Sequence, residues 1–241
     1  MGKKANSHYR SGFLFCIASM VLSARVLAAG WQTVSDLETL EAWQFNSNTT
    51  MVELVEDPEN PSRKVVQIKV RADEPDAKDH AVASATSSLF TEGGTLFFRM
   101  RMPAEDLSPI NGRICFAPEK LNPGNQSCGF KFQGGDRISV SPLTVTEPTK
   151  PAWVQSERWY HVWLYLDARQ QQLVVTLRCV EIGQNWEFSS LIKLPDSSDV
   201  NAFAYFGAVI GRSHTGRPLQ LADFHWVDGV STEVPAGVPA N

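Results

Sequence analysis

Apolar residues recur at every second position along most of this 241-residue chain, and this alternation limits the possible folds more than any other feature. Residues typical of turns interrupt it at intervals of roughly ten residues, as in sandwiches and barrels. Eleven segments are predicted as β-strands: 64–70, 81–90, 95–102, 113–117, 128–133, 137–141, 159–167, 172–180, 187–194, 202–211 and 219–227. One short helix is predicted from Ser35 to Trp43, where Ser35 and Glu38 fit a capping box. So many strands without intervening helices exclude a doubly wound α/β fold and predict an all-β, two-sheet antiparallel jelly-roll sandwich.

One predicted hairpin, residues 158–180, has an unusual outward face. A surface strand normally turns an apolar face to the core and a polar face to water. The predicted inward side of its first strand carries Tyr160, Val162, Leu164 and Leu166, and the other side carries Trp159, His161, Trp163 and Tyr165. Two interpretations follow. The second set forms an open binding platform, or a long loop such as 103–127 or 142–157 folds over it.

The N-terminus has the layout of a secretory signal peptide. A basic leader precedes an apolar run from Gly12 to Leu22, and small residues at Ala28 and Ala29 offer a cleavage site. The run is too short to span a bilayer, which needs about 20 apolar residues. We therefore expect a signal peptide over 1–28, one sandwich domain over 29–230 and a flexible, Pro- and Gly-rich tail over 231–241. The protein is expected to be secreted or periplasmic, with no membrane association after cleavage.

The charge of the chain argues against nucleic acid as a partner. The sequence has 22 Lys and Arg against 26 Asp and Glu, and four of the basic residues lie in the predicted leader. The mature chain is therefore clearly acidic, and it shows no basic stripe of the kind that binds nucleic acid or anionic membranes.

The cysteines and aspartates predict one disulfide and no cofactor. Cys115 and Cys128 flank a short loop rich in Pro, Gly and Asn, and in an oxidising compartment they are expected to pair. Cys179 ends the apolar side of its strand and is expected to be a buried thiol. No zinc-type spacing occurs. Asp136, Asp223 and Asp228 are possible calcium ligands, but three scattered aspartates do not define a calcium site.

Three segments resemble the concanavalin A-like and laminin-G-like jelly rolls. ERWYHVWLYLDARQQQLVVTLRCVEIG (157–183) resembles their central hairpin, GGTLFFRMRMP (93–103) an earlier strand and LQLADFHWVDG (219–229) the closing strand. The resemblance implies a concanavalin A-like fold over most of the mature chain. Lectins, glycosidases, polysaccharide lyases and adhesion modules share that fold, so function has to be inferred from the site.

Known catalytic patterns of this superfamily are absent. The E-x-D-x-x-E motif of its glucanases does not occur, and the nearest acidic stretch, 53–59, has the wrong spacing. A lyase needs a cation or amide to neutralise a uronate carboxylate and a base such as Tyr or His. Six residues could supply these groups if their strands share a sheet: Arg99, Arg101, Lys131, Gln133, His161 and Tyr165. The Gln-Ile-His motif of alginate lyases is absent, however.

The sequence therefore predicts a lectin-like domain that binds an extracellular polysaccharide or other glycan without catalysis. The predicted ligand-binding residues are Trp163, Tyr165, His161, Arg99, Arg101, Lys131 and Gln133. Aromatic rings on an open sheet face can stack on sugar rings, while the basic and amide groups bond the hydroxyls. The first alternative is a polysaccharide lyase or glycoside hydrolase acting on an extracellular polysaccharide, and the second is an adhesion module without a small ligand.

Overall fold

The computed structural model describes residues 30–35, 37–41, 43–45, 50–70, 81–86, 93–104, 109–118, 121, 128–144, 150–167, 170–192, 203–211 and 217–239. The predicted signal peptide lies outside them. In the described ranges the chain forms fifteen strands and no helix, so none there is long and apolar enough to cross a membrane. The strands are β1 (Gln32–Ser35), β2 (Trp43–Phe45), β3 (Thr50–Asp57), β4 (Asn60–Val70), β5 (Ala81–Thr86), β6 (Gly94–Arg101), β7 (Ile110–Ala117), β8 (Cys128–Gly134), β9 (Arg137–Pro142), β10 (Ala152–Gln155), β11 (Tyr160–Asp167), β12 (Gln172–Cys179), β13 (Gln184–Leu191), β14 (Tyr205–Ile210) and β15 (Leu219–Asp228).

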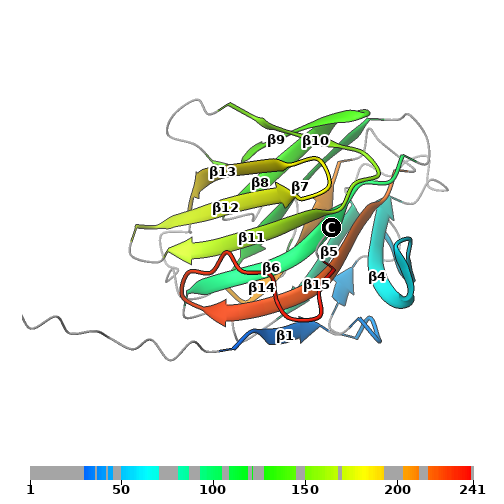
Figure 1. Ribbon diagram of the computed structural model, residues 1–241, viewed down its shortest axis with the longest axis horizontal. Coiled ribbons are helices and arrows are strands. Elements are labelled where there is room, and N and C mark those ends of the chain that lie inside the picture. Colours follow the sequence, from blue (N-terminus) through cyan, green and yellow to red (C-terminus); the bar gives the residue numbers. More distant parts are fainter. Residues whose placement is uncertain are drawn as a thin grey trace, which may run out of the picture.

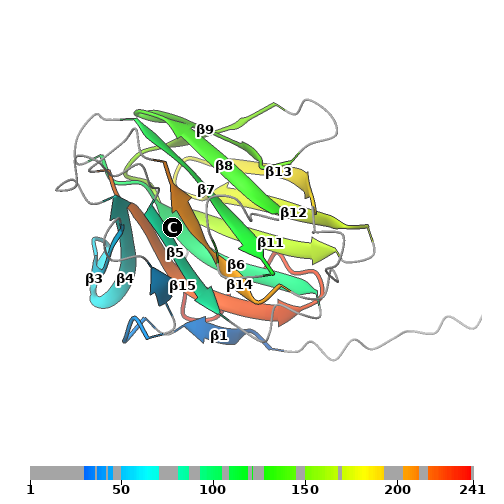
Figure 2. The same ribbon diagram turned by 180° about the vertical axis from the view of Figure 1, so that it is seen from behind.

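The strands form two antiparallel sheets that pack face to face. The first sheet has the order β13-β12-β11-β6-β15-β4-β3, with β1 also paired to β15. The second sheet has the order β10-β9-β8-β7-β14-β5-β2. Figure 1 shows the first sheet toward the viewer, and Figure 2 shows the second sheet from behind. The predicted two-sheet antiparallel sandwich is confirmed.

All eleven predicted strands are present, and four short or N-terminal strands were not predicted: β1, β2, β3 and β10. The predicted helix from Ser35 to Trp43 is wrong. Leu37 to Glu41 forms bends and a turn, and the Leu37 N–H donates to Ser35 Oγ at 3.4 Å. The stretch connects two sheets, because β1 pairs with β15 and β2 pairs with β5. Pairing with two partners outweighs a local capping pattern.

The core between the sheets follows the predicted alternation. Tyr160, Val162, Leu164 and Leu166 of β11 all point into it, and each is at least 97% buried. Phe98 of the first sheet meets Phe206 of the second with ring centroids 5.2 Å apart. Phe206 in turn lies 5.3 Å from Phe116. The Phe98–Phe206 contact joins the two layers, whereas Phe206 and Phe116 are paired neighbours within the second sheet.

The predicted disulfide is absent. Cys115, Cys128 and Cys179 are all free and buried. Cys128 lies opposite Phe116 in the β7–β8 register, so it points into the main core, whereas Cys115 points to the other face of the sheet beside Val209. Two cysteines on opposite faces of a sheet cannot be bridged without rearranging the strands. Burial also raises the pKa of the Cys115 thiol to about 12.

The C-terminal segment, residues 229–239, is held against the first sheet. In Figure 1 it runs in front of β6 and β15 after the last strand. The Thr95 hydroxyl donates to Gly229 O at 2.6 Å and accepts from the Ser231 N–H at 3.0 Å. Arg63 donates to Gly237 O at 3.1 Å. The expectation of a frayed tail from residue 231 therefore does not hold for 231–239, because sheet side chains bond its backbone.

Candidate functional site

The seven predicted ligand-binding residues do not share one surface. Arg99 and Arg101 on β6 lie beside His161, Trp163 and Tyr165 on β11, because these strands pair directly in the first sheet. Lys131 and Gln133 lie on β8, in the second sheet. The combined surface depended on a shared sheet and is wrong. The two groups must be considered separately.

The aromatic side of β11 is covered by the C-terminal segment. Trp163 is 1% exposed and His161 is fully buried. The Trp163 indole N–H donates to Glu233 O at 2.9 Å, and His161 Nε2 lies 3.0 Å from Pro239 O. The ring of Phe97 lies 5.2 Å from that of Trp163. The open platform is therefore wrong for these residues, which form a second small core.

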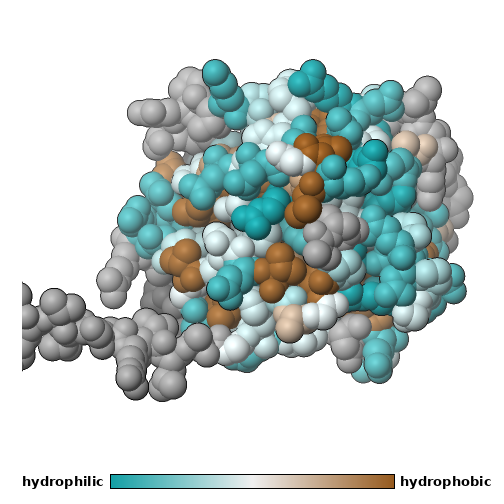
Figure 3. Space-filling view, in the orientation of Figure 1, coloured by the Kyte–Doolittle hydropathy of each residue, from teal (hydrophilic) through white to brown (hydrophobic). Residues whose placement is uncertain are grey.

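The described residues that bond to the rings of Trp163 and His161 belong to 229–239, and parts of both predicted loops lie outside the described residues. Tyr165 remains partly exposed. Arg101 is also largely enclosed, because it pairs with Glu157 and donates to Gln220 Oε1 at 2.8 Å. Figure 3 shows only scattered apolar groups among polar ones on this side of the molecule.

His161 is neutral at physiological pH. Burial lowers its pKa to about 4, the Pro239 carbonyl opposes this, and the nearby Arg99 and Arg178 lower it further. Its Nδ1 has no hydrogen-bond partner among the described residues. A ring in this state is poorly suited to serve as an exposed base in a lyase reaction, because substrate cannot reach it.

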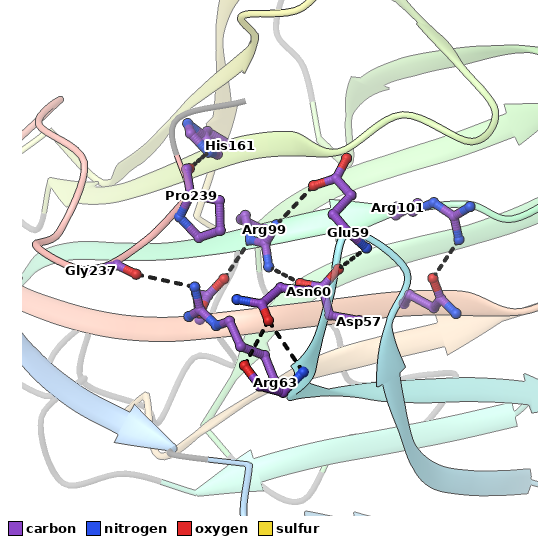
Figure 4. Close-up of polar contacts among 12 residues, drawn as sticks. Asp57, Glu59, Asn60, Arg63, Arg99, Arg101, His161, Gly237 and Pro239 are labelled. Carbon is purple, nitrogen blue, oxygen red and sulfur yellow. Dashed lines mark hydrogen bonds and ion pairs between the residues drawn. The ribbon is translucent and has the colours of Figure 1, made fainter.

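Arg99 sits in a closed network of charges, drawn in Figure 4. Its guanidinium is fully buried and pairs with Asp57 and Asp223. Asp223 also pairs with Arg63, and the Arg99 guanidinium lies 4.4 Å from the centre of the Trp159 ring. Burial lowers the pKa of Arg99, while the hydrogen bond and charge of Asp57 oppose that shift. Glu59 is a third acidic partner of Arg99, at 3.6 Å, so three carboxylates surround the two arginines in a network that belongs to the fold.

A cleft of about 300 Å³ lies next to this network. It is lined by side chains of both signs and by hydroxyls: Thr33, Ser35, Leu37, Glu38, Ser62, Arg63, Lys64, Asp223 and His225. Burial and the charge of Arg63 lower the pKa of His225. Arg63 and Asp223, which both line the cleft, already pair with each other, so neither of these two charges is available to select a ligand.

Part of the outer face of the second sheet, in contrast, is open and polar. On β9, on β10 and from Phe130 onward in β8, buried residues that face the core alternate with accessible residues that face water. The outward Cys115 and Ala117 at the end of β7 are instead buried beside Leu121 and Val209. The outward set on β7 to β10 comprises Asn111, Arg113, Lys131, Gln133, Arg137, Ser139, Ser141, Trp153 and Gln155. We call this set the outer polar face. Figure 2 shows β7, β8 and β9 of this sheet toward the viewer.

The strand register arranges this set into rows across the sheet. Trp153 lies opposite Ser139, Ser139 opposite Gln133, and Gln133 opposite Asn111. The neighbouring row runs through Ser141, Lys131 and Arg113. Neighbouring strands lie about 4.8 Å apart, so the first row spans roughly 14 Å. Lys131 and Gln133 thus lie on an accessible face, and their ligand role stays a prediction.

Trp153 is the large exposed aromatic side chain of this face, at 39% exposure. The guanidinium of Arg137 lies 4.6 Å from the centre of its ring. Sequence reasoning missed this residue because β10 is only four residues long. The available signal was the alternation of Ala152 and Val154, both buried, with Trp153 and Gln155, both exposed.

A hollow of about 630 Å³ adjoins Trp153 at this edge of the molecule. It is lined by Ala104, Asp136, Arg137, Trp153, Gln155, Ser156, Glu157 and Gln184. Glu157 has a left-handed backbone with φ of 64°, which is uncommon for a residue other than glycine. One of its carboxylate oxygens accepts from the Ala104 N–H and the other pairs with Arg101. These bonds hold the rim of the hollow in place.

A buried arginine supports the hollow from behind. Arg217 is 1% exposed and donates to Pro103 O and to Gly135 O, both at 3.0 Å. It also bonds Ser156 Oγ. One guanidinium therefore bonds residues of three different loops, at positions 103, 135 and 156. These bonds hold the loops next to Trp153 in fixed positions.

The described residues contain no group of three or more His, Cys, Asp or Glu side chains that could hold a metal ion. Among the aspartates considered for calcium, Asp223 is held by two arginines and Asp228 accepts from the Trp226 indole at 3.2 Å. Asp136 lines the hollow. The three aspartates lie in different places, so they do not form one calcium site.

No protein-family model and no curated protein matches the chain. Among solved structures, the carbohydrate esterase of Shiga toxin-encoding bacteriophage phi24B has a TM-score of 0.51 and 14% identity, over 83% of this chain and 97% of that chain. Peanut lectin gives the same four values. The catalytic domain of a glycoside hydrolase family 131 protein from Coprinopsis cinerea has a TM-score of 0.50 and 9% identity, over 87% and 88%. The chain has the predicted concanavalin A-like jelly-roll fold, and identities this low show the fold alone.

Proposed function

We propose that this concanavalin A-like sandwich binds carbohydrate, without catalysis, on the outer polar face of its second sheet. The observation that carries the proposal is the exposed Trp153 ring beside the 630 Å³ hollow. A flat indole face covers the apolar face of a sugar ring, and a concave site with a few polar groups then fixes the orientation of the sugar.

The polar groups around Trp153 suit sugar hydroxyls. Gln155 and Gln184 line the hollow, and Gln133 and Asn111 continue the row across the sheet. Amide side chains both donate and accept hydrogen bonds, as do hydroxyl groups. The row therefore offers matched partners to a ligand that extends from Trp153 across the sheet.

The same edge favours binding over hydrolysis. A retaining glycosidase needs two carboxyl groups about 5 Å apart that are free to protonate or attack the substrate. The hollow contains Asp136 and Glu157, but both oxygens of Glu157 are engaged, with Arg101 and with the Ala104 backbone. Peanut lectin, the phage esterase and the glycoside hydrolase are all named for carbohydrate chemistry, which agrees with a carbohydrate ligand. Fold alone does not decide between binding and catalysis.

The proposal places the protein outside the cytoplasm, as a secreted or periplasmic protein, because of its predicted leader. It expects cleavage after Ala28 or Ala29. Expression of the full chain with N-terminal sequencing of the exported product tests this. A product that retains Met1 in the membrane fraction would contradict it.

A glycan array with the mature chain tests the binding site. We expect binding to at least one oligosaccharide class, and a loss of roughly tenfold or more in affinity for Trp153→Ala, since truncating an aromatic anchor typically costs a complex more than about 1.4 kcal/mol. Val180→Ala is the matched control, because Val180 is 52% exposed on the turn after β12. Equal binding by Trp153→Ala would contradict the site.

Incubation of the bound glycans with wild-type protein separates binding from catalysis. The proposal expects no new reducing ends and no unsaturated uronate. Formation of either product would support the hydrolase or lyase alternative. Absence of both binding and product across the array would support an adhesion module without a small ligand.

A further inference from the structure

The acidic residues of the strands are confined to one sheet. The first sheet carries seven: Glu53, Glu56, Asp57, Asp167, Glu187, Asp223 and Asp228. The strands of the second sheet, β2, β5, β7, β8, β9, β10 and β14, carry none. The whole chain has more acidic than basic residues, so the second sheet departs sharply from the average of its own protein.

The charged side chains on the strands of the second sheet are all cations. Arg113, Lys131 and Arg137 belong to the outer polar face, and Lys131 lies directly opposite Arg113 in the β7–β8 pair. Like charges directly opposite each other destabilise a sheet. Within the part of the chain that the structure describes, neither Lys131 nor Arg137 makes an ion pair. The charges of Lys131 and Arg137 are therefore not neutralised by an ion pair among the described residues, and both are available to an anionic ligand.

The described carboxylates near this face lie at its edge. Asp136 and Glu157 line the hollow beside Trp153. Glu157 is already paired with Arg101 of the first sheet. Among the described residues, the charged side chains of the Lys131 row are therefore positive, and positive charges attract anionic ligands and orient them on approach.

We infer that the glycan bound by this face is an anionic polysaccharide, with carboxylate or sulfate groups along its chain. The inference rests on the proposed carbohydrate-binding function of the same face. Trp153 and Arg137 lie at one end, and Ser141, opposite Lys131, is four residues further along β9 than Arg137. At about 3.4 Å per strand residue this separates the two cationic positions by roughly 14 Å. One sugar is too short to reach both, so the ligand is an extended chain whose acidic groups meet successive cations.

The observations favour a polysaccharide over a nucleic acid. Nucleic-acid binding proteins commonly neutralise on the order of six to ten phosphates and stack several bases on aromatic rings. The described outer polar face has three cations and one exposed aromatic ring, Trp153. A chain with fewer charges per unit length than nucleic acid matches this sparse spacing.

Matched pairs of polymers test the inference, because each pair differs in charge alone. Polygalacturonate is compared with its fully methyl-esterified form, and dextran sulfate with dextran, by isothermal titration at low ionic strength. We expect binding to at least one charged member, at least tenfold weaker binding to its neutral counterpart, and a steep loss of affinity with added salt. The polygalacturonate and dextran sulfate arms distinguish carboxylate from sulfate as the recognised group.

Variants assign the effect to the face. Arg113→Gln/Lys131→Gln is expected to weaken binding of the charged polymer by roughly tenfold or more, since charge-assisted hydrogen bonds are lost. Lys64→Gln is the matched control, because Lys64 is similarly exposed but lies on the first sheet. Thermal unfolding confirms that each variant is folded.

The outcomes separate the two proposals. Equal binding of charged and neutral polymers, with loss in Trp153→Ala, overturns the anionic ligand and leaves the carbohydrate site standing. Tighter binding of single-stranded polyuridylate than of either acidic polysaccharide also overturns the anionic glycan. Binding of no glycan of either charge overturns the proposed function and the inference together.

Discussion

The covering of β11 by the C-terminal segment predicts that both faces of this strand stabilise the fold. Trp163 should be as costly to truncate as a residue of the main core, although it points away from that core. The cost should depend on residues 229–239, which cover it. Trp163→Ala in the full chain and in a chain that ends at Asp228 therefore measures what the segment contributes.

The expected magnitude follows from the contacts of Trp163. The side chain is 1% exposed, packs 5.2 Å from Phe97, lies 5.0 Å from the guanidinium of Arg178 and donates to Glu233 O. Truncation of a buried aromatic residue costs about 3–5 kcal/mol. Removing residues 229–241 exposes the ring and removes its hydrogen bond, so the same substitution should cost about 1–3 kcal/mol less in the short chain.

Urea unfolding, followed by circular dichroism, gives the four free energies of this double-mutant cycle. The short chain should also show a red shift in tryptophan emission that is smaller in a Trp163→Phe background. Val230→Ala is the control within the segment, because Val230 is 69% exposed and its truncation should change stability by no more than about 0.5 kcal/mol.

A specific result would refute this reasoning. If Trp163→Ala costs the same in both chains, and the short chain keeps the unfolding midpoint of the full chain, the segment does not seal this face. The outward side of β11 would then be open, as the initial platform hypothesis required.

Three further predictions follow from burial. Leu164→Ala should lower the free energy of unfolding by about 2–5 kcal/mol, and Tyr165→Ala should lower it clearly less. The reason is that the Leu164 side chain is fully buried, whereas Tyr165 is partly exposed. Equal shifts of the urea midpoint in the two variants would contradict this. Because the pKa of His161 is lowered in the folded chain, the unfolded chain binds a proton at this residue first as the pH falls. The free energy of unfolding should therefore decrease between about pH 6.5 and about pH 4, by up to about 3 kcal/mol. In His161→Gln, urea unfolding should show a smaller decrease over the same pH range. Burial raises the pKa of Cys115 to about 12, so a thiol reagent should leave the described cysteines unmodified until urea unfolds the protein, and mass mapping without reduction should find no link between them.

Alternation in the sequence determined eleven of the fifteen described strands and the inward face of β11, because alternation is a local property of the chain. Leu164 and its neighbours on β11 lie in the core as predicted, since a strand places every second side chain on the same face wherever it packs. The same reasoning failed where the pattern was short. At β10, four residues were too few to distinguish a strand from a loop, and Trp153 was missed.

Tertiary structure alone decided what covers each outer face, because that depends on segments far apart in the chain. His161 and Lys131 both point outward from their strands, yet His161 is sealed by Pro239 and Lys131 remains in water. Cys115 and Cys128 are near in sequence but belong to opposite faces, since the β7–β8 register sets Cys128 against Phe116. Alternation fixes which side a residue faces within its strand, whereas the pairing of strands and the path of the tail determine whether that side meets water, a ligand or more protein.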